Sequence, residues 1–353
     1  MTRPVLAVTL GDPAGIGPEI TARTLAAVAG EDGHHGVAVG DAEALRRGVR
    51  AAGVDAEVRE VGGFGTASAG PGVIDVLDTG VLGTRLPDWG TVDPRAGRAA
   101  VAAIETATRA AMAGEAAGIV TGPINKEAIW QAGSQHLGHT EMLGELTGVT
   151  RQDTMFVVRG RAEGAVAGAA PAHHLRIFFT TRHVALRKAL DQITEETVGR
   201  AIREATTALR VFGTEHPRLA VAAVNPHGGE GGAFGDEEIV HITPACERAR
   251  AEGLDVTGPV PADSVFHQGL TGRYDGVLSH FHDQGHIPAK TYDFDGTISV
   301  TVGLPILRTS VDHGTAFDIA GTGRADHGTM LSAYRAGVEY APYAPQIRAT
   351  YGS

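Results

Sequence analysis

Short apolar runs alternate with amphipathic stretches along nearly the whole chain. Continuous apolar runs are typical of buried strands, and they predict strands at 5–10, 36–39, 117–121, 154–158, 175–180, 219–224, 276–278 and 298–302. A helical period predicts helices at 18–29, 42–52, 94–113, 123–132, 194–212, 239–252 and 330–336. Residues 60–95 are rich in Gly, Thr and Pro, which indicates a loop with short strands. This alternation predicts an α/β protein with a largely parallel sheet.

Polar, glycine-rich segments follow several of the predicted strands, after Leu10, Val120, Val224 and Leu278. The carboxyl ends of parallel strands share one edge of a sheet, and ligands usually bind there. No repeat, low-complexity tract or Ser/Pro-rich linker divides the chain. We therefore expect two interleaved subdomains rather than two domains in tandem.

Composition excludes several classes of function. The 353 residues include 30 basic and 41 acidic ones, and the net charge of −11 argues against nucleic acid as a partner. Cys246 is the only cysteine, which excludes an internal disulfide and a cysteine-based metal site and fits a reducing cytosol. A signal-peptide pattern is absent, and no apolar run approaches the ~18 residues of a membrane span. We expect a cytoplasmic protein with no membrane partner.

Three of the sixteen histidines lie in polar loops just after predicted strands: His183, His227 and His282. Imidazole suits Zn²⁺ and related ions, and a catalytic zinc site typically has three protein ligands and one open position. Any one loop histidine can equally be a structural donor, and spacing alone does not single out these three. The competing neighbours are His173, His174, His280 and His286.

Two carboxylates accompany these histidines. Asp283 directly follows His282, and Asp263 lies in a Pro-Ala-Asp segment. A carboxylate beside a metal-bound imidazole can orient it or act as a base, although Asp263 could instead cap a helix. Lys290 is one of only three lysines and is a second candidate base.

Glycine-rich turns that begin helices are candidate anion sites, because helix N-termini offer unpaired N–H groups. They occur at 11–19, 121–126 and 138–141, and none is a P-loop or a clean dinucleotide fingerprint. Lys290 and Arg308 could supply positive charge, or be solvated surface residues. The acidic, glycine-rich loop 312–323 could hold a ribose hydroxyl, or be an ordinary tight connection.

Together these segments resemble the 4-hydroxythreonine-4-phosphate dehydrogenase family. The blocks are Gly-Asp-Pro-Ala-Gly-Ile-Gly-Pro-Glu at 11–19, Thr-Gly-Pro-Ile-Asn-Lys at 121–126, Gly-His-Thr-Glu at 138–141, Asn-Pro-His-Gly-Gly-Glu-Gly-Gly at 225–232, Pro-Ala-Asp at 261–263, His-Asp-Gln-Gly at 282–285 and Gly-Leu-Pro-Ile-Leu-Arg-Thr-Ser-Val-Asp-His-Gly-Thr-Ala at 303–316. They occur in order over nearly the whole chain, so their combination is far more specific than any one block.

The resemblance implies an isocitrate/isopropylmalate-dehydrogenase-like α/β fold of two subdomains with a cleft between them. We expect a cofactor-side subdomain at 1–125 plus 305–353, and a metal, substrate and dimerisation subdomain at 126–304. The family also implies a homodimer with a shared active site, NAD or NADP, and one divalent metal ion per subunit (Zn, Co, Ni, Mg or Mn).

The family pattern assigns roles residue by residue. It makes His183, His227 and His282 the metal ligands, one of them supplied across the dimer. The positions that match substrate contacts are His139, Thr140, Lys290, Ser299 and Arg308. The 313–323 loop also resembles the adenosine-binding loop of isopropylmalate dehydrogenases, which implies cofactor contacts at Gly314, Asp318 and Gly321.

The sequence departs from the family pattern in places. Ser299 stands where asparagine is usual, and Arg182 and Ala185 stand in the run around the first metal histidine. Other sequence motifs are closer to those of paralogues that act on four-carbon sugar-acid phosphates. The first expectation is oxidation of the 3-hydroxyl of 4-phosphohydroxy-L-threonine, in pyridoxal phosphate synthesis. The alternatives are 4-phospho-D-threonate or 4-phospho-D-erythronate, an aromatic cis-dihydrodiol, a non-redox metal enzyme, or a metabolite-binding protein without catalysis.

The expected mechanism places a metal on the substrate hydroxyl, where it lowers the hydroxyl pKa. Asp263, Asp283 or Lys290 then accepts the proton of the hydroxyl. Hydride passes to the nicotinamide, and the resulting β-keto acid loses carbon dioxide. Lys290, Arg308 and the 138–140 turn would hold phosphate and carboxylate.

Overall fold

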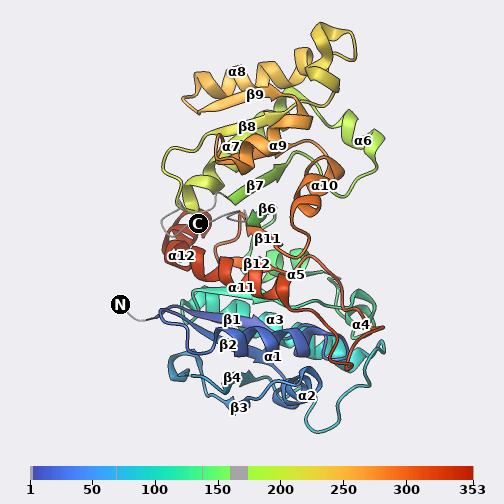
Figure 1. The fold of residues 1–353 in the computed structure, drawn as a ribbon, viewed down its shortest axis with the longest axis vertical. Helices are drawn as coiled ribbons and strands as arrows, with labels where there is room; N and C mark the ends of the chain where they lie inside the picture. The colour runs from blue at the N-terminus through green and yellow to red at the C-terminus, as the bar shows by residue number, and fades with distance from the viewer. Residues whose placement is uncertain (1–2, 69, 137, 160–173, 353) are drawn as a thin grey trace. The chain divides into compact units, whose positions relative to one another are not determined.

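The structure is a computed structural model that describes residues 3–68, 70–136, 138–159 and 174–352, and Figure 1 shows its elements. The chain forms two compact units. Unit 1 comprises Met1–Asp153 and Ile298–Ser353, and unit 2 comprises Thr154–Thr297.

The sheet of unit 1 has the strand order β3-β4-β2-β1-β5-β12-β11. The strands are Val5–Thr9 (β1), His35–Gly40 (β2), Glu57–Glu60 (β3), Val73–Asp78 (β4), Gly118–Thr121 (β5), Thr297–Val302 (β11) and Arg308–Ser310 (β12). Neighbours pair in parallel from β3 to β12. β11 and β12 pair antiparallel, which a short connection between consecutive strands allows.

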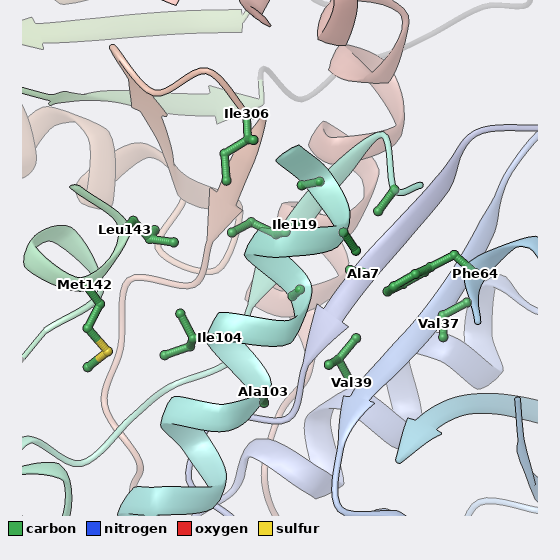
Figure 2. Close-up of a cluster of buried hydrophobic side chains, with 14 of the residues drawn as sticks. Ala7, Val37, Val39, Phe64, Ala103, Ile104, Ile119, Met142, Leu143 and Ile306 are labelled. Atoms are coloured by element: carbon green, nitrogen blue, oxygen red, sulfur yellow. The ribbon is translucent and has the colours of Figure 1, made fainter. Parts of the chain in front are cut away.

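The helices of unit 1 are Gly17–Val28 (α1), Ala42–Ala52 (α2), Pro94–Ala113 (α3), Lys126–Gln131 (α4), His139–Thr147 (α5), Gly328–Tyr340 (α11) and Ala344–Tyr351 (α12), with 3₁₀ turns at Phe64–Thr66 and Ala341–Tyr343. Figure 2 shows Ala103 and Ile104 of α3 together with Ala7, Val37 and Val39 of the strands. The buried face of α3 is mostly alanine, so its backbone can lie close to the sheet.

The unit boundaries differ from those expected at 125/126 and 304/305. Residues 126–153 belong to unit 1 because α4 and α5 pack on α3. Gly97 of α3 makes this close packing possible, since a Cβ there would lie 2.1 Å from the carbonyl oxygen of Ala128. Residues 298–304 belong to unit 1 because β11 pairs with β12.

The sheet of unit 2 has the order β6-β7-β10-β8-β9. Its strands are Asp153–Arg159 (β6), His174–Phe179 (β7), Leu219–Ala222 (β8), Val256–Val260 (β9) and Gly276–Ser279 (β10). β10 pairs in parallel with β7 on one side and with β8 on the other. β6 and β7 are antiparallel, so the sheets are largely but not wholly parallel.

Helices cover both faces of this second sheet. They are Leu186–Asp191 (α6), Glu195–Val211 (α7), Thr243–Ala251 (α8), Ala262–Leu270 (α9) and His282–Tyr292 (α10), with a turn segment of mostly positive φ at Pro226–Gly232 (η2) and a π-helical turn at Glu238–Ile242 (η3). Ile177 and Val277 cluster with Val265 of α9 and Ala289 of α10. α7 packs on β7, β8 and β10 from the other face, since successive strand residues alternate in direction.

Two predicted helices need correction. The predicted helix 123–132 begins only at Lys126, because Asn125 is its N-cap and accepts a hydrogen bond from the backbone N–H of Ala128. The predicted helix 239–252 is divided into the π-helical η3 and α8. In the part of the chain that the structure describes, no helix has the length and apolar character needed to cross a membrane.

Candidate active site

Three loops with candidate metal ligands follow three neighbouring strands of unit 2. His183 follows β7, His282 begins α10 after β10, and His227 lies in η2 after β8. Because β7, β10 and β8 are parallel and adjacent, their carboxyl ends lie at one edge of the sheet. The strand order brings the three loops to one edge of the sheet, and His280 and His286 also follow β10 there.

His183 and His282 lie side by side within this edge. Their ring centroids are 5.9 Å apart, and both rings line one hollow of about 320 Å³ together with Asp283. The Nδ1–H of His282 donates a hydrogen bond of 2.7 Å to Oδ1 of Asp283. This bond fixes the tautomer and leaves the Nε2 lone pair available to a metal ion.

His227 is exposed and has a left-handed backbone conformation, with φ of 53°. That conformation is strained for a residue with a Cβ. The segment is held by Glu238, whose carboxylate accepts hydrogen bonds from the backbone N–H groups of Val224 and Asn225 at 2.7 Å each. Burial alone would raise the pKa of Glu238, but the hydrogen bonds outweigh it and the pKa is lowered.

His183 and His282, from adjacent loops, line one hollow, and imidazoles suit a divalent metal of borderline softness. Within the described residues, no three His, Cys, Asp or Glu side chains converge on one point in a way that could hold a metal ion. His183 and His282 are the paired members of the set, and His227 is not brought to them within the chain.

A second hollow of about 340 Å³ adjoins His282 and contains Lys290 and His286 in its wall. The structure therefore brings two of the three candidate bases, Lys290 and Asp283, to the surroundings of His282. Asp263 is exposed in the first turn of α9, and α9 contacts the η2 turn that carries His227. Asp263 does not cap α9, because Pro261 is the N-cap residue.

Arg308 of unit 1 is buried among hydroxyl groups. Its guanidinium donates hydrogen bonds to Thr121 at 2.9 Å, Thr301 at 2.9 Å and Ser310 at 3.0 Å. Ser299 is paired with Ser310 across β11 and β12. Since side chains two residues apart share a face of a strand, Ser299 lies on the face of Thr301 and Arg308.

His139 lies near this arginine at the start of α5. Burial, and then the charge of Arg308, hold the pKa of His139 well below its usual value, so the imidazole is neutral at physiological pH. Its Nε2 atom is buried and makes no hydrogen bond with the described residues. A buried nitrogen without a hydrogen-bond partner in the described residues, beside a buried cation, can contact an anionic ligand. The neighbouring Thr140 is exposed.

The expected cofactor loop packs against the 11–19 turn, also within unit 1. The N–H of Ile16 donates to the carbonyl of Thr315 at 3.0 Å, and Glu19 accepts from the N–H groups of Gly321 at 2.5 Å and Gly323 at 3.0 Å. Sequence blocks at opposite ends of the chain therefore form one surface.

The three predicted cofactor residues differ in surroundings. Gly314 and Asp318 are exposed, and a Cβ on Gly314 would meet nothing within 4 Å. At Gly321, φ is +77° and a Cβ would lie 2.3 Å from the Trp89 ring. Packing alone is therefore enough to require glycine at position 321.

Several residues that shape these loops had no assigned role in the sequence interpretation. Glu19 and Gln284 lie inside the family motifs at 11–19 and 282–285. Glu238 lies outside these motifs, and no local pattern in the sequence indicates its role. His280 had been only a competing metal ligand, and its ring points into the sheet edge, with Nε2 2.7 Å from the carbonyl oxygen of Ala222. Of the other competitors, His173 lies outside the described residues.

The profile of the family described as "Pyridoxal phosphate biosynthetic protein PdxA" matches residues 32–337. The chain belongs to this family. A Cutibacterium acnes protein, provisionally named D-threonate 4-phosphate dehydrogenase, is 52% identical over 349 residues, with 99% of this chain and 97% of the relative covered. A Symbiobacterium thermophilum protein with the same provisional name is 46% identical, with 96% and 97% covered.

Solved structures agree with the family. A 4-hydroxythreonine-4-phosphate dehydrogenase from Klebsiella pneumoniae has a TM-score of 0.85 and 41% identity, with 96% of this chain and 98% of that chain covered. A terephthalate 1,2-cis-dihydrodiol dehydrogenase from Burkholderia xenovorans has a TM-score of 0.64 and 31% identity, with 95% and 98% covered. The mixed α/β fold and the dehydrogenase class of the chain follow from these relatives.

Proposed function

We propose that this chain oxidises the 3-hydroxyl of a 4-phosphorylated four-carbon hydroxy acid, with 4-phospho-D-threonate as the first candidate. The observation that carries the reaction class is the Asp283–His282 pair beside His183. The substrate order rests on the relatives at 52% and 46% identity, which carry the D-threonate name. 4-Phosphohydroxy-L-threonine, the first expectation from sequence, becomes the alternative.

The proposed reaction removes the 3-hydroxyl proton and a hydride from C3, and the β-keto acid then loses carbon dioxide. When bound, a divalent metal would lower the hydroxyl pKa, and NAD or NADP would take the hydride. Asp283 holds the proton on Nδ1 of His282, which keeps Nε2 directed outward. Lys290, near His282, can receive the substrate proton or bind a carboxylate.

The phosphate is assigned to Arg308 and His139. Arg308 supplies the charge, and its hydroxyl partners fix the direction of its donors. A neutral His139 adds a hydrogen bond without a second charge. The loop with Gly314, Asp318 and Gly321 is assigned to the adenosine part of the cofactor, on an isopropylmalate-dehydrogenase-like fold.

A cytoplasmic homodimer is part of the proposal. Within the described residues of one chain, His227 does not join His183 and His282 in a group of three. A second copy that supplies the remaining histidine would complete a three-ligand site with one open position.

The test is reduced-nicotinamide absorbance with metal-loaded protein, NAD⁺ or NADP⁺, and four substrates: 4-phospho-D-threonate, 4-phospho-D-erythronate, 4-phosphohydroxy-L-threonine and an aromatic cis-dihydrodiol. We expect turnover with 4-phospho-D-threonate. Arg308→Gln should raise the KM for the phosphorylated acid, while Arg335→Gln, at a surface position, serves as the matched control. Turnover of 4-phosphohydroxy-L-threonine alone would contradict the substrate choice. Silence with all four substrates in metal-bound protein would contradict the reaction.

A further inference from the structure

Three strand ends of unit 2 are tied together by side chains that make no direct contact with the candidate metal position. We infer that His280 and Gln284 form a frame that positions the metal-ligand loops and so sets the metal affinity of the site. This inference rests on the proposed function, because it takes the loops after β7, β8 and β10 to be metal loops. His280 is therefore a positioning residue and not a ligand.

His280 follows β10 and is completely buried. Its Nε2 lies 2.7 Å from the carbonyl oxygen of Ala222, at the end of β8. A carbonyl can only accept, so Nε2 carries the proton and donates. Nδ1 is then the acceptor for the hydroxyl of Thr180, 3.2 Å away, just after β7. One neutral ring thus joins the two strands that flank its own.

The backbone around His280 strengthens the same connection. Its carbonyl accepts from the N–H of Thr181 at 3.2 Å and from the Thr181 hydroxyl at 2.8 Å. These bonds hold the chain that leads from β7 to His183, two residues further on. The position of the first candidate ligand relative to β10 is set by this pair.

Gln284 completes the frame from α10. Its Oε1 accepts from the N–H of His280 at 2.7 Å, and its Nε2 donates to the carbonyl of Ala223 at 2.7 Å. Because Gln284 lies in the first turn of the helix that His282 begins, it fixes that helix against the end of β8. The loop toward His227 starts at the same place.

The metal-ligand loops therefore depend on hydrogen bonds behind them. Partners behind the ligands of a metal site typically change metal affinity by about 10- to 100-fold when they are mutated. Removal of the frame should weaken metal binding through misplacement of loops, with every candidate ligand still present.

The experiment measures the zinc dissociation constant of the full chain by competition with a chromophoric chelator. His280→Leu removes both ring hydrogen bonds, and we expect a dissociation constant about 10- to 100-fold higher. His280→Gln keeps a donor that can reach Ala222 and should recover most of the affinity. His216→Leu is the matched control, because that side chain is 92% exposed in the same unit.

A second variant keeps the proposal testable if His280→Leu does not fold. Gln284→Met removes the helix side of the frame from a partly exposed position, and it should weaken zinc binding in the same direction. Thermal unfolding with and without zinc adds a second readout. A purely structural role would lower both melting temperatures equally and leave the dissociation constant unchanged.

The outcomes separate the two proposals. Folded His280→Leu and Gln284→Met proteins with wild-type zinc affinity would overturn the frame and leave the proposed function intact. A wild-type protein that binds no zinc, cobalt, nickel, manganese or magnesium would overturn both. Weaker zinc binding in both variants, with a wild-type value for His216→Leu, is the supporting result.

Discussion

The candidate cofactor loop of unit 1 (residues 312–323) and the candidate metal loop after β8 in unit 2 (residues 225–232) are held in the same way. Each is fixed by a buried glutamate that accepts hydrogen bonds from backbone N–H groups. Glu19 holds Gly321 and Gly323 across the length of the chain, while Glu238 holds amides only 13 and 14 residues away. Charged acceptors make stronger hydrogen bonds than neutral ones, which suits loops that must keep one shape.

The two loops differ in whether a predicted site residue with a Cβ takes the left-handed conformation. In the candidate cofactor loop, φ is +77° at Gly321 and 42° at Ala316, which has no predicted role. In the candidate metal loop the left-handed residues include His227, a predicted ligand, where φ is 53°. Glycine adopts this conformation without strain, whereas a side chain there costs free energy. Position 321 therefore requires glycine because of packing. At position 227 the strained residue is a candidate metal ligand.

The largest effect is expected at His227. Both His227→Gly and His227→Ala remove the candidate ligand, and kcat should fall by about a thousandfold or more, because a lost metal contribution is worth several kcal/mol. His227→Gly also relieves the left-handed strain. Its unfolding free energy should exceed that of His227→Ala by about 1 kcal/mol in chemical denaturation. Equal stability of the two variants would show that position 227 is unstrained.

Gly321→Ala should introduce strain, whereas His227→Gly relieves it. The new Cβ meets Trp89 in a positive-φ conformation, so the unfolding free energy should fall by about 2–3 kcal/mol. Gly314→Ala is the matched control, because a Cβ there meets nothing within 4 Å. A change in nicotinamide affinity without loss of stability in Gly314→Ala would support cofactor contact at that position. Unchanged stability in Gly321→Ala would contradict the interpretation that packing requires glycine at position 321.

Asp12, in the turn that packs on the cofactor loop, contrasts with both glutamates. It is fully buried, and its Oδ2 makes no hydrogen bond with the described residues. Burial raises its pKa from 3.8 to about 6, although a hydrogen bond from the backbone of Ala14 opposes the rise. Between about pH 4 and 6 the folded state therefore binds more protons than the unfolded state, so this group favours folding increasingly as pH falls.

Asp12→Asn should remove that pH dependence. Relative to the variant, the wild type should gain on the order of 2–3 kcal/mol of unfolding free energy between pH 7 and pH 4, from a shift of about two pKa units. Urea unfolding of both proteins at several pH values measures the difference. Parallel stability curves across this range would show that Asp12 is ionised in the folded state.

The smallest effect is expected for Glu19→Gln. One acceptor oxygen remains, and the new amide N–H₂ faces a backbone N–H, so about 1.4 kcal/mol of loop stabilisation should be lost. The cofactor KM should rise about tenfold while kcat at saturating cofactor is nearly unchanged. Arg23, which donates to the carbonyl of Gly323, offers a comparison through Arg23→Gln. A fall in kcat with normal KM would mean that Glu19 acts on the chemistry rather than on the loop.

Local signals in the sequence predicted most elements correctly. The helices at 42–52 and 94–113 agree with the structure in both bounds, and Thr194 is the N-cap of α7 as its position suggested. Helices α6, α9, α10 and α12 and strands β3, β9 and β12 were not predicted, and only the start of α5 was expected, at the 138–141 turn. They are brief or polar, and the contacts that stabilise them come from distant segments.

The sequence by itself determined the alternation of strands and helices, the family motifs and the candidate ligands, because hydrophobic periodicity and motif sequences are local properties. Only the tertiary structure decided that His183 lies beside His282 and that Glu19 holds the loop at 321–323. These outcomes depend on which strands become neighbours and which groups are buried together. That choice is made by packing between segments far apart in the chain, so no local pattern records it.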